Sequence, residues 1–531
     1  MGKTYDAVVV GGGHNGLTCA SYLARAGLDV LVAERRHTVG GPCGDYEYFP
    51  GYRSSLACSP EGFASKIAAN LSLERHGLKF VRSDAELIVP FADGRAFVGW
   101  RSHNRLLEEI TKFSSRDVKA YEQFFKHLTH FAERLQISLF DQPPTYKTLL
   151  SRLATTADEA AFSDWFLGSL RDLLDREFES EQVKALIAGP AVVANRFGPS
   201  TPGSALTLLM QALSRATEAP SRGEESAAVS LYDTLGLPIG GMGAITEALR
   251  RSIESAGGGV RTGCDVAHIN TSESGVHGVT LCTGEEILAK VVVSNLHPHT
   301  TLVDLVDAER LESDCLTRIQ ALRHPGSAFK IGLALEDLPQ FNAGTGLGDT
   351  HAGCQFRWAP TLDYMDHAAE QLRLGVWSEA PMFCGFTPSV IDPGAAPTGQ
   401  HLMSVNVSHA PSELANGHWE AEKDRFGKHC INAMSQFIPN LLDIITDYRF
   451  WSPADLESEF GLVGANITHL DMAPSAMFAR RPMHGMSDYR TPIDGLYLCG
   501  SGTFPGGMVT GVPGHNASHQ VLADLQAGRG K

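Results

Sequence analysis

The stretch YDAVVVGGGHNGLTCASYLARAGLDVLVAE, residues Tyr5–Glu34, decides how the chain begins to fold. An apolar run from Ala7 to Val10 leads into a glycine-rich turn, an alanine-rich segment follows, and a second apolar run ends at Glu34. This order is typical of a strand, a tight turn, a helix and a second strand. The sequence therefore predicts a nucleotide-binding unit at the start of the chain.

The glycines of the turn follow the pattern G-x-G-x-x-G, and each has a physical task. Gly11 allows the tight turn, Gly13 lets the backbone approach a pyrophosphate, and Gly16 lets the helix pack closely on the strand. The pyrophosphate would lie on free N–H groups at the positive end of the helix, where His14 and Asn15 stand. We predict dinucleotide binding here rather than an ordinary glycine turn.

An acidic residue and a second glycine pair follow the turn. Glu34 stands 21 residues after the middle glycine of the fingerprint, where a carboxylate accepts hydrogen bonds from a ribose. An acid there disfavours the 2′-phosphate of NADP, but the fingerprint alone does not separate NAD from FAD. Arg35 and Arg36 precede Gly40 and Gly41, which favours a second place where backbone wraps the diphosphate over a plain surface turn.

The combined pattern, E-x-R-x-x-x-G-G after G-x-G-x-x-G, resembles the superfamily of FAD-binding amine oxidases and phytoene desaturases. In that superfamily the first unit binds the ADP half of FAD. The stretch 238–270 is similar to its P-x-G-G-M-x-x-[IL] segment, and by that resemblance Val266 matches the residue whose backbone holds the adenine. The most similar subgroup is the phytoene dehydrogenase-related flavoproteins, including those labelled pyridine nucleotide-disulfide oxidoreductase domain-containing.

The last sixty residues contain another glycine-rich loop that enters a helix. Glycines there remove side chains where a flavin and its ribityl phosphate approach the backbone, and the helix dipole can stabilise negative charge on reduced flavin. The resemblance therefore implies FAD as the cofactor. The contacts that it implies in this segment are Gly500, Ser501, Gly511, Val512 and Asn516. Many relatives carry Asp where Ser501 stands, so this chain lacks that charge.

Candidate groups for chemistry are few. His515 is the candidate for proton transfer because histidine titrates near neutral pH, although hydride transfer in this superfamily often needs no dedicated base. The ten cysteines form no C-x-x-C pair, so we expect neither a disulfide framework nor a metal site. Cys43 follows a glycine pair as in flavin disulfide reductases, but the partner position holds Tyr48, which favours a packing residue or a flavin neighbour.

The fold class that we predict is α/β: a Rossmann-type FAD-binding domain, an interleaved α+β substrate domain and a helical cap. Alternation around Asp93 and Gly94 predicts a hairpin, and helical periodicity over about 104–213 predicts a cap above a substrate cavity. Alternation over 328–335 and 401–409 predicts an antiparallel sheet, whose apolar face meets either a ligand or a core. The predicted segments are FAD-binding 1–95, cap 96–229, FAD-binding 230–300, substrate-binding 301–464 and FAD-binding 465–531.

Composition narrows the partners. The net charge of −16 argues against nucleic acid or an anionic membrane surface as the main partner. No run approaches the ~20 apolar residues of a membrane span, and the first strand begins almost at once. We expect a cytoplasmic protein, with peripheral membrane contact left open.

The resemblance implies an FAD-dependent oxidoreductase in which flavin N5 accepts a hydride from a hydrophobic, polyene- or isoprenoid-like substrate during desaturation or isomerisation. Oxygen or a quinone would take the electrons, since no second G-x-G-x-x-G marks a nicotinamide domain. Two alternatives stay open: a flavin oxidase of an amine or other small molecule, and a non-catalytic flavin-binding interaction protein. Sequence leaves the substrate, the direction of reaction and the oligomeric state undetermined.

Overall fold

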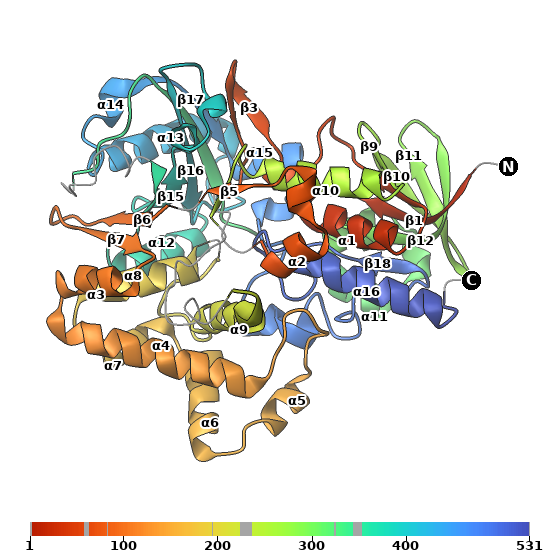
Figure 1. The fold of residues 1–531 in the computed structure, drawn as a ribbon, viewed down its shortest axis with the longest axis horizontal. Coiled ribbons are helices and arrows are strands. Elements are labelled where there is room, and N and C mark those ends of the chain that lie inside the picture. Colours follow the sequence, from red (N-terminus) through yellow and green to blue (C-terminus); the bar gives the residue numbers. More distant parts are fainter. Residues whose placement is uncertain are drawn as a thin grey trace.

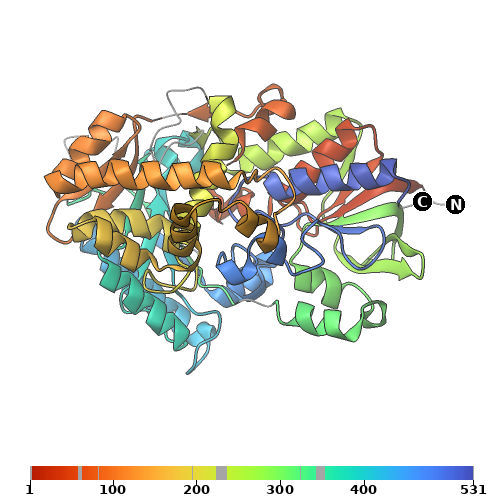
Figure 2. The same cartoon turned by 90° about the horizontal axis from the view of Figure 1, so that it is seen from below.

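A computed structural model describes residues 3–57, 63–81, 83–193, 195–222, 236–322, 325–342 and 353–529, with the side chains of 218–222 excluded. Two seven-stranded sheets organise these residues, and a layer of helices lies beside them (Figures 1 and 2). Both termini lie at the end of the molecule that holds the first sheet (Figure 1). The predicted α/β class is confirmed.

The first sheet has the order β10-β11-β12-β1-β2-β9, and β18 pairs with the end of β12. The strand β1 runs parallel to β2 and β12 on its two sides. Strands in such a position are buried on both faces, which is why β1 reads as an unbroken apolar run. Its strands are β1 Thr4–Val10, β2 Val30–Ala33, β9 Gly259–Arg261, β10 Val266–Ser272, β11 Gly275–Leu281, β12 Glu286–Ser294 and β18 Leu496–Leu498. The helix α1 (His14–Arg25) packs against both α10 (Gly243–Ser255) and α16 (Val512–Gln526).

The second sheet has the order β17-β13-β16-β15-β14-β6-β7. Its strands are β6 Ala85–Pro90, β7 Ala96–Trp100, β13 Phe329–Leu335, β14 Gln355–Trp358, β15 Met382–Phe386, β16 His401–Ser408 and β17 Ile445–Trp451. The predicted hairpin is confirmed as β6 and β7, and the predicted antiparallel pairing is confirmed as β13 with β16. The hairpin lies in this sheet, however, and not with the FAD-binding segment 1–95, because Leu87 of β6 pairs with Gln355 of β14.

One face of the second sheet forms an ordinary protein core. Phe329, Ile331 and Leu333 of β13 are buried with Phe426 and Met434 of the helix α13 (Trp419–Ser435). Of the two options left by the sequence, the apolar face therefore packs on protein. The opposite face of this sheet is the one that can meet a ligand.

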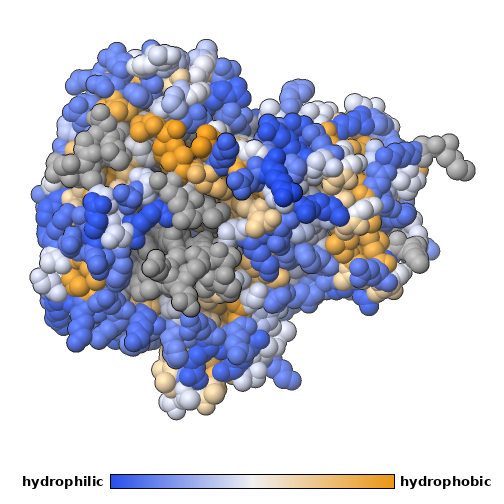
Figure 3. All heavy atoms as spheres, viewed as in Figure 1, coloured by the Kyte–Doolittle hydropathy of each residue, from blue (hydrophilic) through white to orange (hydrophobic). Residues whose placement is uncertain are grey.

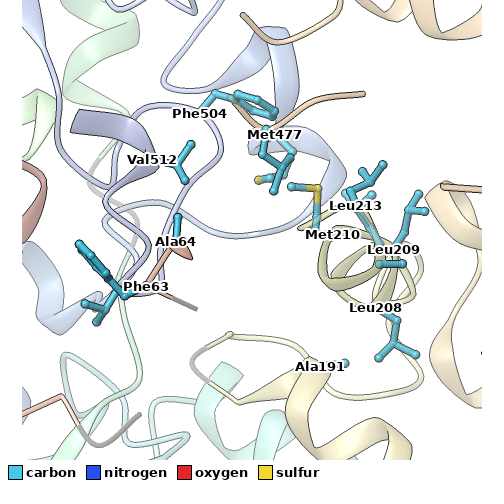
Figure 4. Close-up of a cluster of buried hydrophobic side chains, with 14 of the residues drawn as sticks. Phe63, Ala64, Ala191, Leu208, Leu209, Met210, Leu213, Met477, Phe504 and Val512 are labelled. Atoms are coloured by element: carbon cyan, nitrogen blue, oxygen red, sulfur yellow. The ribbon is translucent and has the colours of Figure 1, made fainter. Parts of the chain in front are cut away.

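Helices α3–α9 form the predicted helical layer. They are α3 His103–Thr111, α4 Ser115–Leu135, α5 Tyr146–Ser151, α6 Thr156–Phe162, α7 Leu170–Glu177, α8 Glu181–Val192 and α9 Leu206–Arg222. Leu209, Met210 and Leu213 of α9 lie in the same apolar cluster as Met477 and Phe504, which come from C-terminal loops (Figure 4). This cluster fixes the helical layer to the first-sheet unit. The predicted boundary at residues 229 and 230 lies outside the described residues.

Short elements complete the described chain: α2 Ser65–Asn70, α11 Ser313–Gln320, α12 Leu362–Arg373, α14 Leu441–Ile444, α15 Pro453–Phe460, the hairpin β3 Tyr46–Phe49 with β4 Tyr52–Ser54, and the pair β5 Phe80–Val81 with β8 Leu237–Pro238. The face seen in Figure 3 is mostly hydrophilic, with separate hydrophobic areas. Among the described helices, none combines the length and the apolar character that crossing a membrane requires.

Candidate functional site

A cavity of about 590 Å³ is lined by residues from both sheets. Its walls include the end of β1 and the start of α1 on one side, and residues of β13, β14, β15 and β16 on the other. Gly11, Gly13, His14 and Asn15 line the first part, and Lys330 lines the second. One cavity therefore joins the predicted nucleotide site to the second sheet.

The first glycine turn forms a backbone cradle. Gly11 has a φ of +93°, which favours glycine, and Gly13 caps α1 without any side-chain hydrogen bond to the first N–H groups. A Cβ on Gly13 would lie 2.6 Å from Nδ2 of Asn295, and one on Gly16 would lie 2.3 Å from the Gly11 carbonyl oxygen. The turn thus leaves N–H groups at the positive end of a helix facing a cavity, which is the arrangement that binds phosphate.

The second glycine pair lies directly against the first turn. The Gly40 N–H donates to the Gly12 carbonyl oxygen over 2.7 Å. Gly40 has a φ of +120° and Gly41 a φ of +54°, so both positions favour glycine. Gly41 lines the cavity. The two glycine stretches form one wall, as the prediction of a second wrapping point requires.

Glu34 is held at the edge of the cavity by backbone groups. Its carboxylate accepts hydrogen bonds from the N–H of Gly12 over 2.7 Å and of Arg36 over 2.9 Å. The residue is only 6% exposed, yet it lines the cavity. Each carboxylate oxygen can accept a further hydrogen bond, so the group suits a ribose.

The two arginines after Glu34 line the cavity, but their guanidinium groups bind elsewhere. Arg36 lies 4.5 Å from the ring centres of both Tyr46 and Phe460, and it donates to the Glu459 carbonyl oxygen over 2.6 Å. Arg35 donates to the same carbonyl over 3.3 Å. The arginines therefore hold the end of α15 beside the ribose position.

The remaining predicted contacts divide into two groups. Val266 and Ser501 line the cavity, and Ser501 Oγ accepts a hydrogen bond from Asn15 Nδ2 over 3.3 Å. Gly500 fits its loop against β12, since a Cβ there would lie 2.5 Å from the Asn295 carbonyl oxygen. Gly511, Val512 and Asn516 are absent from the cavity wall formed by the described residues.

The C-terminal glycine-rich segment positions a helix. A Cβ on Gly514 would lie 2.0 Å from the Asn15 carbonyl oxygen, so this glycine lets α16 approach α1. Asn516 Nδ2 donates to the Leu139 carbonyl oxygen over 2.8 Å. These glycines support the cradle from behind.

His515 is placed away from the cavity, and its predicted role in proton transfer finds no support in its position. The ring packs edge-on against Tyr22 and Phe140, and its Nδ1 pairs with Oδ1 of Asn516 over 2.8 Å. Burial lowers the pKa of His515 to about 4. It is a packing residue between α16 and its neighbours.

His14 takes the position that the sequence assigned to a flavin neighbour. It lines the cavity, and Cys43 Sγ lies 3.6 Å from its Nδ1. Burial lowers the pKa of His14 to about 4, although the nearby Met508 carbonyl acts in the opposite direction. Burial also raises the pKa of Cys43 to about 12, so the pair is a neutral imidazole and a neutral thiol near pH 7. The described cysteines are all free.

Three buried polar atoms of cavity-lining residues make no hydrogen bond within the described residues: Nε2 of His14, Oδ1 of Asn15 and Nδ1 of His469. Buried polar groups normally have partners, so these atoms indicate a polar ligand. Burial lowers the pKa of His469 well below its usual value, with nearby His297 and Arg481 acting in the same direction. The uncapped helix, the glycine wall, Glu34 and these atoms together fit a dinucleotide with a polar ring system.

Arg481 is a supporting residue that sequence reasoning missed. It is 0% exposed, and its guanidinium donates to the carbonyl oxygens of Thr468 over 2.7 Å, Ser501 over 2.6 Å and Asp471 over 3.0 Å. Burial lowers its pKa to about 9, so it is charged near pH 7. Thr468 and Ser501 line the cavity, so Arg481 positions that wall. An arginine within an otherwise apolar segment was the available signal.

Metal chemistry has no assembled ligand set in the part of the chain that the structure describes, where no three His, Cys, Asp or Glu residues are placed to hold an ion. Lys330 is a second residue that sequence reasoning missed. It lies in the middle of β13, is 2% exposed, and its Nζ donates to Oδ1 of Asn406 over 2.9 Å. A lysine inside an apolar strand could have signalled it.

Comparisons with known proteins agree with this geometry. The family model described as "Flavin containing amine oxidoreductase" matches residues 16–518. The mouse (Mus musculus) pyridine nucleotide-disulfide oxidoreductase domain-containing protein 2 is 33% identical over 98% of this chain and 94% of its own. A polypeptide of the limonene dehydrogenase from Castellaniella defragrans is 26% identical over 98% of this chain and 95% of its own.

Two further relatives extend the comparison. The chloroplastic prolycopene isomerase of Arabidopsis thaliana is 24% identical over 98% of this chain and 83% of its own. A structure of putrescine oxidase bound to putrescine aligns with a TM-score of 0.61 at 15% identity, covering 99% of both chains. At that identity the likeness shows a shared fold.

Proposed function

The chain belongs to the flavin-containing amine oxidoreductase family and its cofactor is FAD, and on this premise we propose that it dehydrogenates a carbon–carbon bond of an isoprenoid- or polyene-like substrate. FAD, when bound, supplies the acceptor for a hydride from the substrate. Oxygen or a quinone is the proposed final electron acceptor.

The observation that carries this proposal is the continuity of the cavity. The glycine cradle and Glu34 lie in the same cavity as Lys330 and the second sheet. A molecule on the second sheet therefore shares one enclosed space with the cofactor, which is what direct hydride transfer requires. A protein that only stored the cofactor would not need the second wall.

The residues at the junction have definable tasks. The N-terminus of α1 and Gly41 hold the diphosphate, and Glu34 holds the ribose. His14 is neutral near pH 7 because its pKa is about 4, so its Nε2 can accept a hydrogen bond or a proton from a bound molecule. The neutral Cys43 thiol packs beside it. These residues keep the junction free of fixed charge, which suits the loss of a hydride and a proton from adjacent carbons.

The choice of a carbon–carbon bond over an amine rests on two supports. Two relatives are named for limonene dehydrogenation and prolycopene isomerisation, and both names concern unsaturated isoprenoids. The cavity face of the second sheet also carries Lys330 and Arg357. Cationic side chains repel an ammonium substrate, so amine oxidation is the less favoured reaction.

The test is anaerobic reduction of the FAD-loaded protein, followed by visible absorption. Unsaturated isoprenoid hydrocarbons, alcohols and acids form one panel, and primary and secondary amines form the other. We expect the flavin band to bleach with members of the isoprenoid panel only. Bleaching by amines, without any response to isoprenoids, would contradict the proposal.

A further inference from the structure

Four polar residues form a row across the second sheet. The register pairs Lys330 of β13 with Asn406 of β16, Asn406 with Cys384 of β15, and Cys384 with Arg357 of β14. Paired residues on neighbouring strands present their side chains on the same face. All four line the cavity. At a strand spacing of about 4.8 Å, the row extends over about 14 Å.

The row is specific to the cavity face. The residues that precede or follow these four on the same strands are Phe329, Phe356, Phe383 and Val407, and all belong to the core on the other face. Alternation along each strand separates the two sets. The sheet thus presents an apolar face to protein and a polar row to the cavity.

The row carries positive charge at both ends. Lys330 is 2% exposed, and Arg357 donates from Nη2 to Oε1 of Gln355, two residues earlier on β14, over 2.9 Å. The acidic residues that line the cavity in the described part of the chain are Glu34, Asp265, Asp304 and Glu457, and none belongs to a strand of the second sheet. Cationic side chains beside a desolvated cavity favour an anionic ligand.

Apolar residues supply the rest of the wall. Pro190 and Val193, at the end of α8, line the cavity, as do Leu56 and Ala57. A ligand that fits both parts of the wall has an apolar body and one anionic end. The planar guanidinium of Arg357 suits a carboxylate because it can donate two parallel hydrogen bonds.

We propose that the substrate is an amphipathic carboxylic acid whose carboxylate binds the cavity face of the second sheet at Arg357, with Lys330 adding positive potential along the same row. This inference rests on the proposed function and specifies its substrate class. It makes Arg357 the residue that sets specificity. It also explains why a site built for an unsaturated apolar chain carries a lysine and an arginine.

The experiment measures equilibrium binding to the FAD-loaded protein through the change in flavin absorption. The probes are hexanoate, octanoate, geranate and retinoate, each beside its own alcohol. We expect at least one acid to bind ten-fold or more tightly than its alcohol. Arg357→Met should remove that preference while leaving alcohol binding unchanged, and Arg357→Lys should keep part of it.

The matched control is Arg373→Met, since Arg373 is exposed on α12 and pairs with Glu370. This variant should bind every probe as the native protein does. Equal binding of acids and alcohols throughout the series, or an acid preference that survives Arg357→Met, would overturn the inference. Binding is measured without turnover, so selective acid binding by a protein that no isoprenoid reduces would contradict the proposed function and support the acid site.

Discussion

The carboxylate of Glu34 accepts a hydrogen bond from the backbone N–H of Gly12 over 2.7 Å, so the ribose-binding residue also fixes the glycine turn. A second backbone donor, the N–H of Arg36, binds the other carboxylate oxygen. The carboxylate thereby joins the ends of β1 and β2 at the edge of the cavity. Cofactor binding and the shape of the turn depend on the same group.

Glu34→Gln should weaken FAD binding by ten-fold or more. Glutamine offers one acceptor oxygen where two backbone donors need one each, so one N–H loses its partner at a cost of about 1–3 kcal/mol. The measurement is FAD titration of the cofactor-free protein. Glu370→Gln, at an exposed carboxylate on α12, is the control and should bind FAD normally. Equal affinity in both variants would refute the role of Glu34.

Gly13→Val should abolish FAD retention while the protein remains folded. A Cβ at this position would lie 2.6 Å from Asn295 Nδ2, a side-chain end that can shift, so the added atoms mainly fill the cradle. Flavin content after purification gives the readout. The control is Gly189→Ala in α8, where a Cβ would make only an ordinary contact of 4.0 Å with Met365. A fully yellow Gly13→Val protein would place the diphosphate elsewhere.

The part of the site that is local in sequence could be predicted, and the part made by long-range packing could not. Gly11, Gly13 and Glu34 belong to one strand-turn-helix-strand unit, whose spacing fixes their geometry. The row from Lys330 to Arg357 depends on the register of four strands that are distant in sequence, which no single pattern encodes.

His515 illustrates the opposite error. It stands in a glycine-rich segment that the resemblance connects with flavin, but Gly514 brings α16 onto α1 and His515 packs between Tyr22 and Phe140. A glycine needed for contact between two helices and a glycine needed for contact with a ligand have the same sequence signature. The roles of Gly511, Val512 and Asn516 as direct cofactor contacts stay predictions.

Arg481→Met should destabilise the fold by roughly 3 kcal/mol or more, because it leaves several buried carbonyl oxygens without a donor. Urea unfolding of the cofactor-free protein measures this change. The neighbouring Arg480 is exposed and donates to the Ser475 carbonyl oxygen, so Arg480→Met should alter the unfolding free energy by about 0.5 kcal/mol or less. Similar effects from the two variants would show that Arg481 is not a structural anchor.

The fold should lose stability as pH falls from 6.5 towards 4. Burial lowers the pKa of His409 from 6.5 to about 4, so the unfolded chain takes up the proton first. The stability linked to this group is complete above pH 6.5 and is lost through that window, by at most roughly 3 kcal/mol. His14 and His515, with the same lowered pKa of about 4, should add to the loss.

His409→Leu tests this assignment, since both ring nitrogens of His409 are buried without a hydrogen bond in the described structure. The variant should show a smaller loss of unfolding free energy between pH 7 and pH 5 than the native protein, measured by urea unfolding at each pH. An unchanged pH dependence would mean that other groups control acid stability.

The visible absorption spectrum of the purified protein, with identification of the released cofactor, tests the central claim most directly. The glycine cradle, Glu34 and the cavity atoms that lack a partner among the described residues predict a yellow protein that releases FAD, or a cofactor-free protein that regains the flavin spectrum when FAD is added. A colourless protein that cannot be reconstituted with FAD would contradict the account.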